Sequence, residues 1–172
     1  MQNVEFKAEL RDPQLARIIC GHVGAQHLMT FGQKDTYYRV PSGRMKKREQ
    51  DGEPVEYILY HRHDRLRPKL SHFTIMTEEV MQERFGQREM PVLCVVEKTR
   101  DLWMYRNVRI HLDDVVGLGK FIECEALVSP RQHLGRCHRR IAKLRKKFTP
   151  AMGELISCGY AELVQNEVGA EA

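Results

Sequence analysis

Short segments in which apolar and polar residues alternate recur along most of this chain, and they restrict its fold more than any other feature. A period of two places successive side chains on opposite faces of a β-strand. Turn residues such as Pro41-Ser42-Gly43 and Asp51-Gly52-Glu53-Pro54 separate neighbouring segments. We therefore predict eight strands near residues 3–10, 34–40, 43–49, 54–63, 69–76, 91–99, 102–112 and 120–128.

Helix signals interrupt these strands at two places. Asp12 can cap a helix whose first residue is Pro13, because proline fits the first turn and an aspartate accepts its free N–H groups. Thr77 can cap a short second helix that Gly86 ends. Both helices lie between predicted strands, as in an α+β fold built on an antiparallel sheet.

The C-terminal part of the chain is predicted to be helical. One helix is expected over 130–147, and Thr149-Pro150 is expected to open a second one, so that helices fill 130–164. The sequence shows no internal repeat and no low-complexity linker, and 172 residues suit one domain. Residues 1–172 are therefore predicted to form a single α+β domain with its strands within 3–128.

The charged residues of the predicted strands gather on one face of each strand. One group is nearly all cationic and includes Arg44, Lys46 and Arg48, whereas Glu123 and Glu125 form an isolated carboxylate pair. A one-sided sheet that turns its charged face to water accounts for any single strand. The joint pattern favours a closed eight-stranded barrel with a polar interior and with helices over its apolar outer faces.

A charged interior of this kind restricts the ligand that it can hold. Clustered Arg and Lys side chains repel one another unless a multivalent anion lies between them, and Arg matches phosphate oxygens in pairs. Clustered carboxylates favour divalent cations such as Mg²⁺ or Mn²⁺ shared with phosphate. The residue types therefore point to a metal-bound triphosphate. His111 beside Asp113 is a further candidate for acid–base work.

The basic excess of the chain is concentrated near its C-terminal end. The formal net charge is +5, and no acidic residue occurs between Glu125 and Glu154. A solvated helix face explains such a segment most simply, although it also attracts polyanions such as nucleic acid or polyphosphate. The eight cations of this stretch are Arg131, Arg136, Arg139, Arg140, Lys143, Arg145, Lys146 and Lys147.

Other classes of protein find no support in the sequence. The chain has no G-x-x-x-x-G-K-[ST] phosphate loop and no G-x-S-x-G elbow. It has no apolar run of about 18 residues and no signal-peptide core at its start, and its five cysteines are scattered. We therefore expect a cytoplasmic chain with reduced thiols and no membrane partner.

Several motifs of the charged strands follow one another in an order found in a known family. Asn3-Val4-Glu5-Phe6-Lys7 is similar to E-x-E-x-K, with Asn in place of the first Glu, and 43–49 is similar to G-R-L-K-x-R. Residues 117–125 are similar to G-x-G-x-F-x-E-x-E. Over 3–128 the chain resembles the CYTH superfamily, the triphosphate tunnel metalloenzymes, and is most similar to class IV adenylyl cyclase-like members. The motifs between the two ends are Tyr60-His61-Arg62, Lys69-x-Ser71, Val96 to Arg100 and Arg109 to Asp113.

The resemblance implies an eight-stranded antiparallel tunnel that binds a triphosphate end to end. Glu5, Glu123 and Glu125 would then hold catalytic Mg²⁺ or Mn²⁺ with help from Asp113, and Glu5, Lys7 and Asp113 would be catalytic. The implied substrates are ATP, thiamine triphosphate or tripolyphosphate. ATP would be cyclised to cyclic AMP and pyrophosphate, or a triphosphate would be hydrolysed by water. A non-catalytic polyphosphate or nucleic-acid binder is the alternative of another class, and a homodimer is left open. The implied phosphate-binding residues are Lys7, Arg44, Lys46, Arg48, Arg62, Lys98, Arg100 and Arg109.

Overall fold

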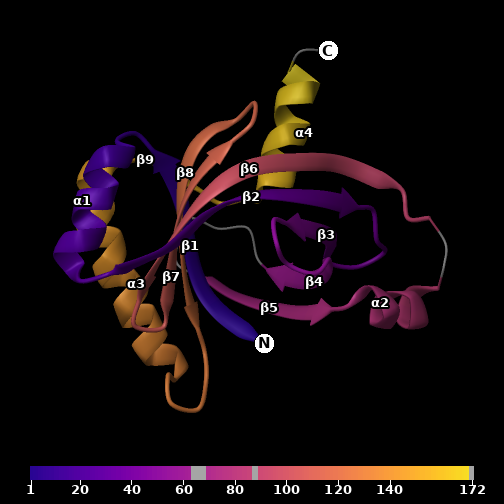
Figure 1. Ribbon diagram of the computed structural model, residues 1–172, viewed down its shortest axis with the longest axis horizontal. Helices are drawn as coiled ribbons and strands as arrows, with labels where there is room; N and C mark the ends of the chain where they lie inside the picture. Colours follow the sequence, from indigo (N-terminus) through magenta and orange to yellow (C-terminus); the bar gives the residue numbers. More distant parts are fainter. Residues whose placement is uncertain (63–68, 87–88, 171–172) are drawn as a thin grey trace.

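The computed structural model describes residues 1–62, 69–86 and 89–170. Within these residues one sheet has the strand order β5-β4-β3-β2-β6-β7-β8-β1-β9, and β5 also pairs with β1. The pairing of β5 with β1 closes β1 to β8 into an antiparallel barrel, which confirms the predicted fold class (Figure 1). The strands are β1 Gln2–Leu10, β2 Gln26–Tyr38, β3 Arg44–Gln50, β4 Glu56–Arg62, β5 Lys69–Met76, β6 Val92–Tyr105, β7 Val108–Val115, β8 Gly119–Leu127 and β9 Met152–Ile156.

The helices lie outside the barrel, and the first two begin where the sequence places their caps. The side chain of Asp12 accepts a hydrogen bond from the N–H of Leu15, and the side chain of Thr77 accepts one from the N–H of Val80. No helix within the described ranges has the length and apolar character that a membrane span requires. The helical elements are α1 Pro13–Val23, α2 Glu78–Phe85, α3 Leu134–Phe148, the 3₁₀ turn η1 Thr149–Ala151 and α4 Tyr160–Ala170.

The main apolar core lies between the barrel and two of these helices. α1 and α3 cover one side of the barrel (Figure 1), where the outward side chains of β1, β7 and β8 pack against them. Along β7 the buried core residues Val108, Ile110 and Leu112 alternate with residues that face the interior. This core arrangement confirms that apolar outer faces lie under helices. The α3 side chains of the core are Cys137, Ile141, Leu144 and Phe148.

The predicted gap between strands 91–99 and 102–112 is wrong, because β6 runs unbroken through Arg100 and Asp101. The two charges lie on opposite faces of the strand. Arg100 points into the barrel and donates to Asp113, whereas Asp101 lies outside and accepts hydrogen bonds from Arg17 and Thr30. Each charge therefore has its own partner, and two consecutive charges do not interrupt the ladder. The predicted strand 102–112 is the end of β6, a turn and the start of β7.

Three further predictions about secondary structure are corrected. Thr149-Pro150 opens only the 3₁₀ turn η1, and 152–156 form β9, which pairs with β1. An apolar pattern of five residues fits a strand or a helix, and here the free edge of β1 selects the strand. β2 begins at Gln26, eight residues before the predicted start, because pairing with β6 extends a segment whose N-terminal half is exposed. The predicted helix over 130–147 begins at Leu134.

Candidate functional site

The interior of the barrel contains a cavity of about 440 Å³. Inward side chains of β1 to β8 line it, together with Gly159 and with Tyr160 at the start of α4. Among the described residues its charged lining comprises six cations, and five carboxylates oppose them. The cations are Lys7, Lys46, Arg48, Lys98, Arg100 and Arg109, and the carboxylates are Glu5, Asp35, Glu56, Glu123 and Glu125.

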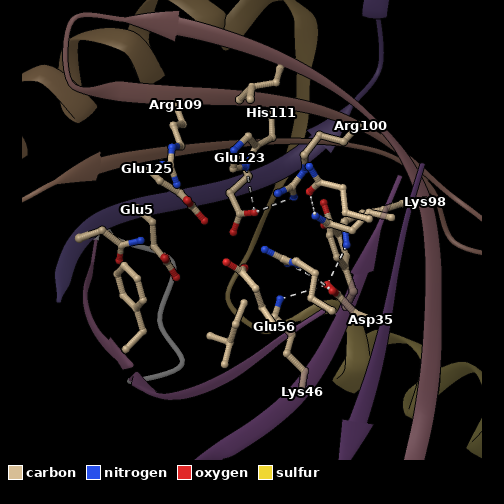
Figure 2. Close-up of a pocket in the computed structure, with 18 of the residues that line it drawn as sticks. Glu5, Asp35, Lys46, Glu56, Lys98, Arg100, Arg109, His111, Glu123 and Glu125 are labelled. Atoms are coloured by element: carbon tan, nitrogen blue, oxygen red, sulfur yellow. Dashed lines mark hydrogen bonds and ion pairs between the residues drawn. The ribbon is translucent and has the colours of Figure 1, made fainter. Parts of the chain in front are cut away.

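An acidic cluster occupies one region of this cavity. Ligand atoms of His111, Glu123 and Glu125 lie within 4.8 Å of one another. The strand register brings them together, because His111 pairs with Glu123 across β7 and β8, and Glu5 pairs with Glu125 across β1 and β8. Figure 2 shows the carboxylates of Glu5, Glu123, Glu125 and Glu56 pointing toward one central space.

The donor atoms of this cluster suit a divalent metal ion. Nδ1 of His111 is buried and has no hydrogen-bond partner among the described residues, although Oε2 of Glu123 lies 3.7 Å away. A buried polar atom without a partner is costly, and a bound ion would satisfy it. Two carboxylates and one imidazole form a set that transition metals accept readily. Glu5, Glu123 and Glu125 line the same part of the cavity and remain the predicted metal ligands.

The carboxylate of Glu123 is held in its charged form by its neighbours. Burial alone would raise the pKa of Glu123, but Lys7, His111 and Arg100 outweigh it and hold that pKa well below its ordinary value. Nζ of Lys7 lies 3.5 Å from Glu123 and 3.7 Å from the centre of the Tyr160 ring. Lys7 therefore sits between the acidic cluster and α4.

A second charged cluster, unpredicted from the sequence, surrounds Asp35. Its carboxylate has no exposed surface and accepts hydrogen bonds from Lys46 at 3.0 Å, Lys98 at 2.9 Å and Arg48 at 2.9 and 3.0 Å (Figure 2). Three cations share one carboxylate, so the Asp35 cluster keeps a surplus of positive charge. Asp35 thereby offsets part of the cation repulsion that the sequence led us to assign to an anion alone.

This surplus of positive charge changes how the two lysines titrate. Burial and the neighbouring Arg48 lower the pKa of Lys46 to about 7, although Asp35 opposes them. Burial also lowers the pKa of Lys98 to about 8, with Asp35 again opposing it. Both lysines therefore exchange protons close to neutral pH, and an anion placed beside them would favour their charged forms.

Asp113 lies behind the cavity lining and holds Arg100 in place. Arg100 donates two hydrogen bonds to its carboxylate at 2.7 Å, and the hydroxyl of Tyr160 donates a third at 2.7 Å. Burial would raise the pKa of Asp113, but Arg100 outweighs it and lowers that pKa to about 2. Asp113 is not among the described residues that line the cavity. This position suits a residue that orients Arg100. It does not suit the metal ligand that was predicted.

The predicted phosphate-binding residues divide into three groups. Lys7, Lys46, Arg48, Lys98, Arg100 and Arg109 line the cavity. Arg44 is not among the described lining residues, and its side chain forms an ion pair with Glu162 of α4. Arg62 ends β4, but its side chain lies outside the described residues.

The register of β3 separates Arg48 from Lys47, and this separation can be tested. Arg48 faces the cavity, whereas Lys47 lies on the outer face and pairs with Glu49. We expect Arg48→Ala to weaken tripolyphosphate binding at least about 10-fold, since charged hydrogen bonds contribute about 1.5–3 kcal/mol. Lys47→Ala should bind as the wild type does. Calorimetric titration measures both affinities, and equal losses would contradict the register.

An apolar collar adjoins the acidic cluster. It consists of side chains from β2 and β6 that line the same cavity, and Met29 is 47% exposed. The ladders place Leu102 opposite His111 and Met104 opposite Arg109, so the collar lies beside the acidic cluster and not beside Asp35. An exposed apolar surface inside a charged cavity suits a ligand with an apolar or aromatic part. The collar residues are Leu28, Met29, Phe31, Leu102 and Met104.

Several residues of the site escaped sequence reasoning. Asp35 is a single carboxylate in a predicted strand, and only the pairing of β2 with β3 and β6 reveals its three partners. The inward face of 56–62 includes Glu56, which gave a weak signal for an inward carboxylate. Tyr160 lies within the predicted helical region 130–164, but nothing in the sequence indicated its hydrogen bond to Asp113.

A closed antiparallel barrel with a charged, ligand-sized interior and helices over its apolar outside defines a tunnel class of protein. The sequence model of the CYTH domain matches residues 1–160, so this chain belongs to the CYTH domain family. Proteins of this family are typically metal-dependent enzymes. A search of the curated proteins finds no match to this chain.

Solved structures share the fold at low sequence identity. A conserved hypothetical protein from Pyrococcus furiosus is 16% identical, with a TM-score of 0.72 and coverage of 94% of this chain and 99% of that one. A candidate adenylate cyclase from Vibrio parahaemolyticus is also 16% identical, with a TM-score of 0.69 and coverage of 95% and 97%. A candidate adenylyl cyclase from Hippeastrum, described with a dominant triphosphatase activity, is 15% identical, with a TM-score of 0.58 and coverage of 91% of each chain. At these identities the likeness establishes the fold.

Proposed function

We propose that this chain is a divalent-metal-dependent enzyme that acts on an organic triphosphate inside the barrel, with ATP, cyclised to cyclic AMP and pyrophosphate, as the leading substrate. The main support for this proposal is the order in which apolar, acidic and cationic side chains follow one another along the cavity. The apolar collar adjoins the acidic cluster, and the surplus-positive Asp35 cluster lies beyond it. This order matches a molecule with an organic group at one end and phosphates at the other.

The acidic cluster would hold the metal ion. Glu123, Glu125 and His111 would be its ligands, with Glu5 beside them, and a divalent ion supplies a positive charge that stabilises phosphate oxygens as a bond breaks. Mg²⁺ prefers oxygen ligands, whereas Mn²⁺ accepts an imidazole readily. The presence of His111 therefore favours Mn²⁺ as the activating ion.

The cations would bind the phosphates and neutralise their charge. Lys46, Arg48 and Lys98 are already gathered by Asp35, so little reorganisation is needed when phosphate oxygens arrive. Arg100 is held by Asp113 and lies between this group and Glu123. It can therefore stabilise the negative charge that develops at the cleaved bond. Glu5 lines the same space and is the candidate acceptor for the proton of the attacking hydroxyl.

The nucleophile separates two reactions that share this site. The ribose 3′-hydroxyl gives cyclic AMP, and water gives a triphosphatase. The collar supports the first reaction, because burying a base beside the metal fixes the ribose near the α-phosphate. The Hippeastrum neighbour, with its dominant triphosphatase activity, supports hydrolysis as the second candidate.

One assay tests the proposal. Purified protein is incubated with ATP, thiamine triphosphate and tripolyphosphate, each with Mn²⁺, Mg²⁺ or chelator, and cyclic AMP, pyrophosphate and phosphate are followed. Cyclic AMP from ATP, formed faster with Mn²⁺, is the expected result. Phosphate release without cyclic AMP would make hydrolysis the reaction. Binding of all three compounds without turnover would favour the non-catalytic alternative and overturn the enzyme proposal.

The titration of Lys46 and Lys98 predicts that triphosphate binding takes up protons. At pH 8 the Lys98 ammonium, with a pKa of about 8, and the Lys46 ammonium, with a pKa of about 7, are partly deprotonated, and a bound anion raises both pKa values. Affinity for tripolyphosphate should therefore fall as the pH rises from 7 to 9. Titration calorimetry at pH 8 in buffers of different ionisation enthalpy measures the uptake.

A matched variant controls the proton uptake. Lys46→Arg/Lys98→Arg keeps both positive charges, but arginine does not lose its proton in this pH range. The variant should bind tripolyphosphate without uptake and with little change between pH 7 and 9. Identical binding enthalpies of the wild type in both buffers would contradict the lowered lysine pKa values.

A further inference from the structure

The outer face of α3 carries a cationic stripe that the tunnel chemistry does not use. The apolar residues of α3, such as Ile141 and Leu144, face the barrel, and the cations lie away from that face over about 17 Å, with the half-buried Arg140 at its edge. Within the described part of the chain, none of these cations forms an ion pair with a carboxylate. Arg140 donates only to the neutral side chains of Asn107 and Gln132. The stripe consists of Arg136, Arg139, Arg140, Lys143, Lys146 and Lys147.

Helix stability does not explain the stripe. Cations near the C-terminal end interact favourably with the helix dipole, which accounts for Lys146 and Lys147. Arg136 lies in the first turn, where the dipole opposes positive charge, and that turn contains no acidic residue. Arg136 with Arg140, and Lys143 with Lys147, are four residues apart and repel each other. The helix therefore keeps these charges against its own stability.

We infer that the α3 stripe binds the phosphate backbone of duplex nucleic acid without reading its sequence. Arg and Lys side chains are the usual ligands of backbone phosphates, and a rigid helix on a closed barrel presents them in fixed positions to an equally rigid duplex. Proteins that hold single strands add aromatic side chains for base stacking, and the aromatic residue of α3, Phe148, is buried. Leu134 at the start of α3 is exposed, but one apolar residue does not make the apolar face with which a helix lies in a membrane surface.

The test compares the salt dependence of binding between two variants of equal charge. Anisotropy of a labelled 20-base-pair duplex of mixed sequence is measured between 50 and 200 mM salt. Six phosphate contacts predict that wild-type affinity falls about 10³-fold over this range. The stripe variant Arg136→Gln/Arg139→Gln/Lys143→Gln/Lys146→Gln keeps good helix formers, and its affinity should fall only about 10-fold over the range, from a weaker value at 50 mM.

The control variant carries the same loss of charge on other elements. Lys34→Gln/Arg39→Gln/Arg84→Gln/Lys120→Gln removes four exposed cations away from α3 and should keep the wild-type salt dependence. Equal losses in both variants would show a net-charge effect and overturn the inference. Absence of duplex binding by the wild type at 50 mM salt would also overturn it. So would tighter binding of a 20-nucleotide single strand, of inorganic polyphosphate at equal phosphate concentration, or of anionic phospholipid vesicles.

Discussion

Glu125→Gln is expected to lower metal-dependent turnover of the triphosphate substrate at least about 100-fold, with the fold intact. Loss of a partner of a metal ligand alone costs 10–100-fold, so removal of a ligand charge should cost at least as much. Glu125 is partly exposed, so its replacement leaves no buried charge unpaired. Steady-state rates across a Mn²⁺ titration give kcat and the apparent metal affinity.

Two further variants complete this experiment, one at Glu123 of the acidic cluster and one at a control glutamate on the outer face of the barrel. Glu123→Gln should lose as much turnover, but it also leaves Lys7 and Arg100 with one buried partner fewer, so its melting temperature should fall. Glu97→Gln, on the exposed outer side of β6, is the matched control and should behave as the wild type. A Glu123→Gln/Glu125→Gln double variant with wild-type rates in Mn²⁺ would remove this pair from the site.

Asp35→Asn is expected to destabilise the protein by about 3–5 kcal/mol, the usual cost of breaking a buried ion pair from one side. The change preserves the shape of the side chain but leaves Lys46, Arg48 and Lys98 facing one another without a counter-charge. Tripolyphosphate should restore more of the melting temperature in this variant than in the wild type, because it supplies the missing negative charge.

Asp114→Asn is the control for this change of stability. Asp114 also pairs with a lysine, Lys120, but its side chain is 59% exposed, and surface pairs contribute only about 0–1 kcal/mol. Thermal and urea unfolding of both variants compare the two costs. Equal destabilisation would show that the Asp35 cluster does not hold the barrel together. Because the pKa of the Asp35 carboxyl is already depressed, the wild type should keep this stabilisation at neutral pH and lose it only as the pH falls below about 4.

The sequence predicted the closed barrel because its charge pattern repeats on the inward face of many strands. Apolar and charged residues alternate along 108–113, and in the structure Val108, Ile110 and Leu112 lie in the core while Arg109 and His111 line the cavity. The sequence of a single strand does not predict which residues it contacts on other strands of the barrel. The partnership of Asp35 with Lys46 and Lys98 depends on residues 11 and 63 positions away, which a local pattern cannot reveal.

Local patterns also failed where tertiary contacts override them. The two predicted strands were separated at Arg100-Asp101, yet each charge has a partner on its own side of the unbroken β6. β9 was predicted as part of a helix. The edge of β1 with which it pairs lies about 150 residues earlier in the chain, so no local pattern indicates the strand. Arg44 belongs to the cationic face of β3 by period, but Glu162 of α4 draws its side chain away.

The last wall of the cavity comes from Gly159 and Tyr160, which are synthesised after every strand of the barrel. Synthesis proceeds from the N-terminus at about 5–20 residues per second, so β1 waits for the partners that complete its pairing. Lys7 meets Ile156 only after the chain has grown that far, and Tyr160 then donates to Asp113. A nascent chain that has not yet reached Tyr160 therefore lacks the complete cavity and cannot enclose a ligand.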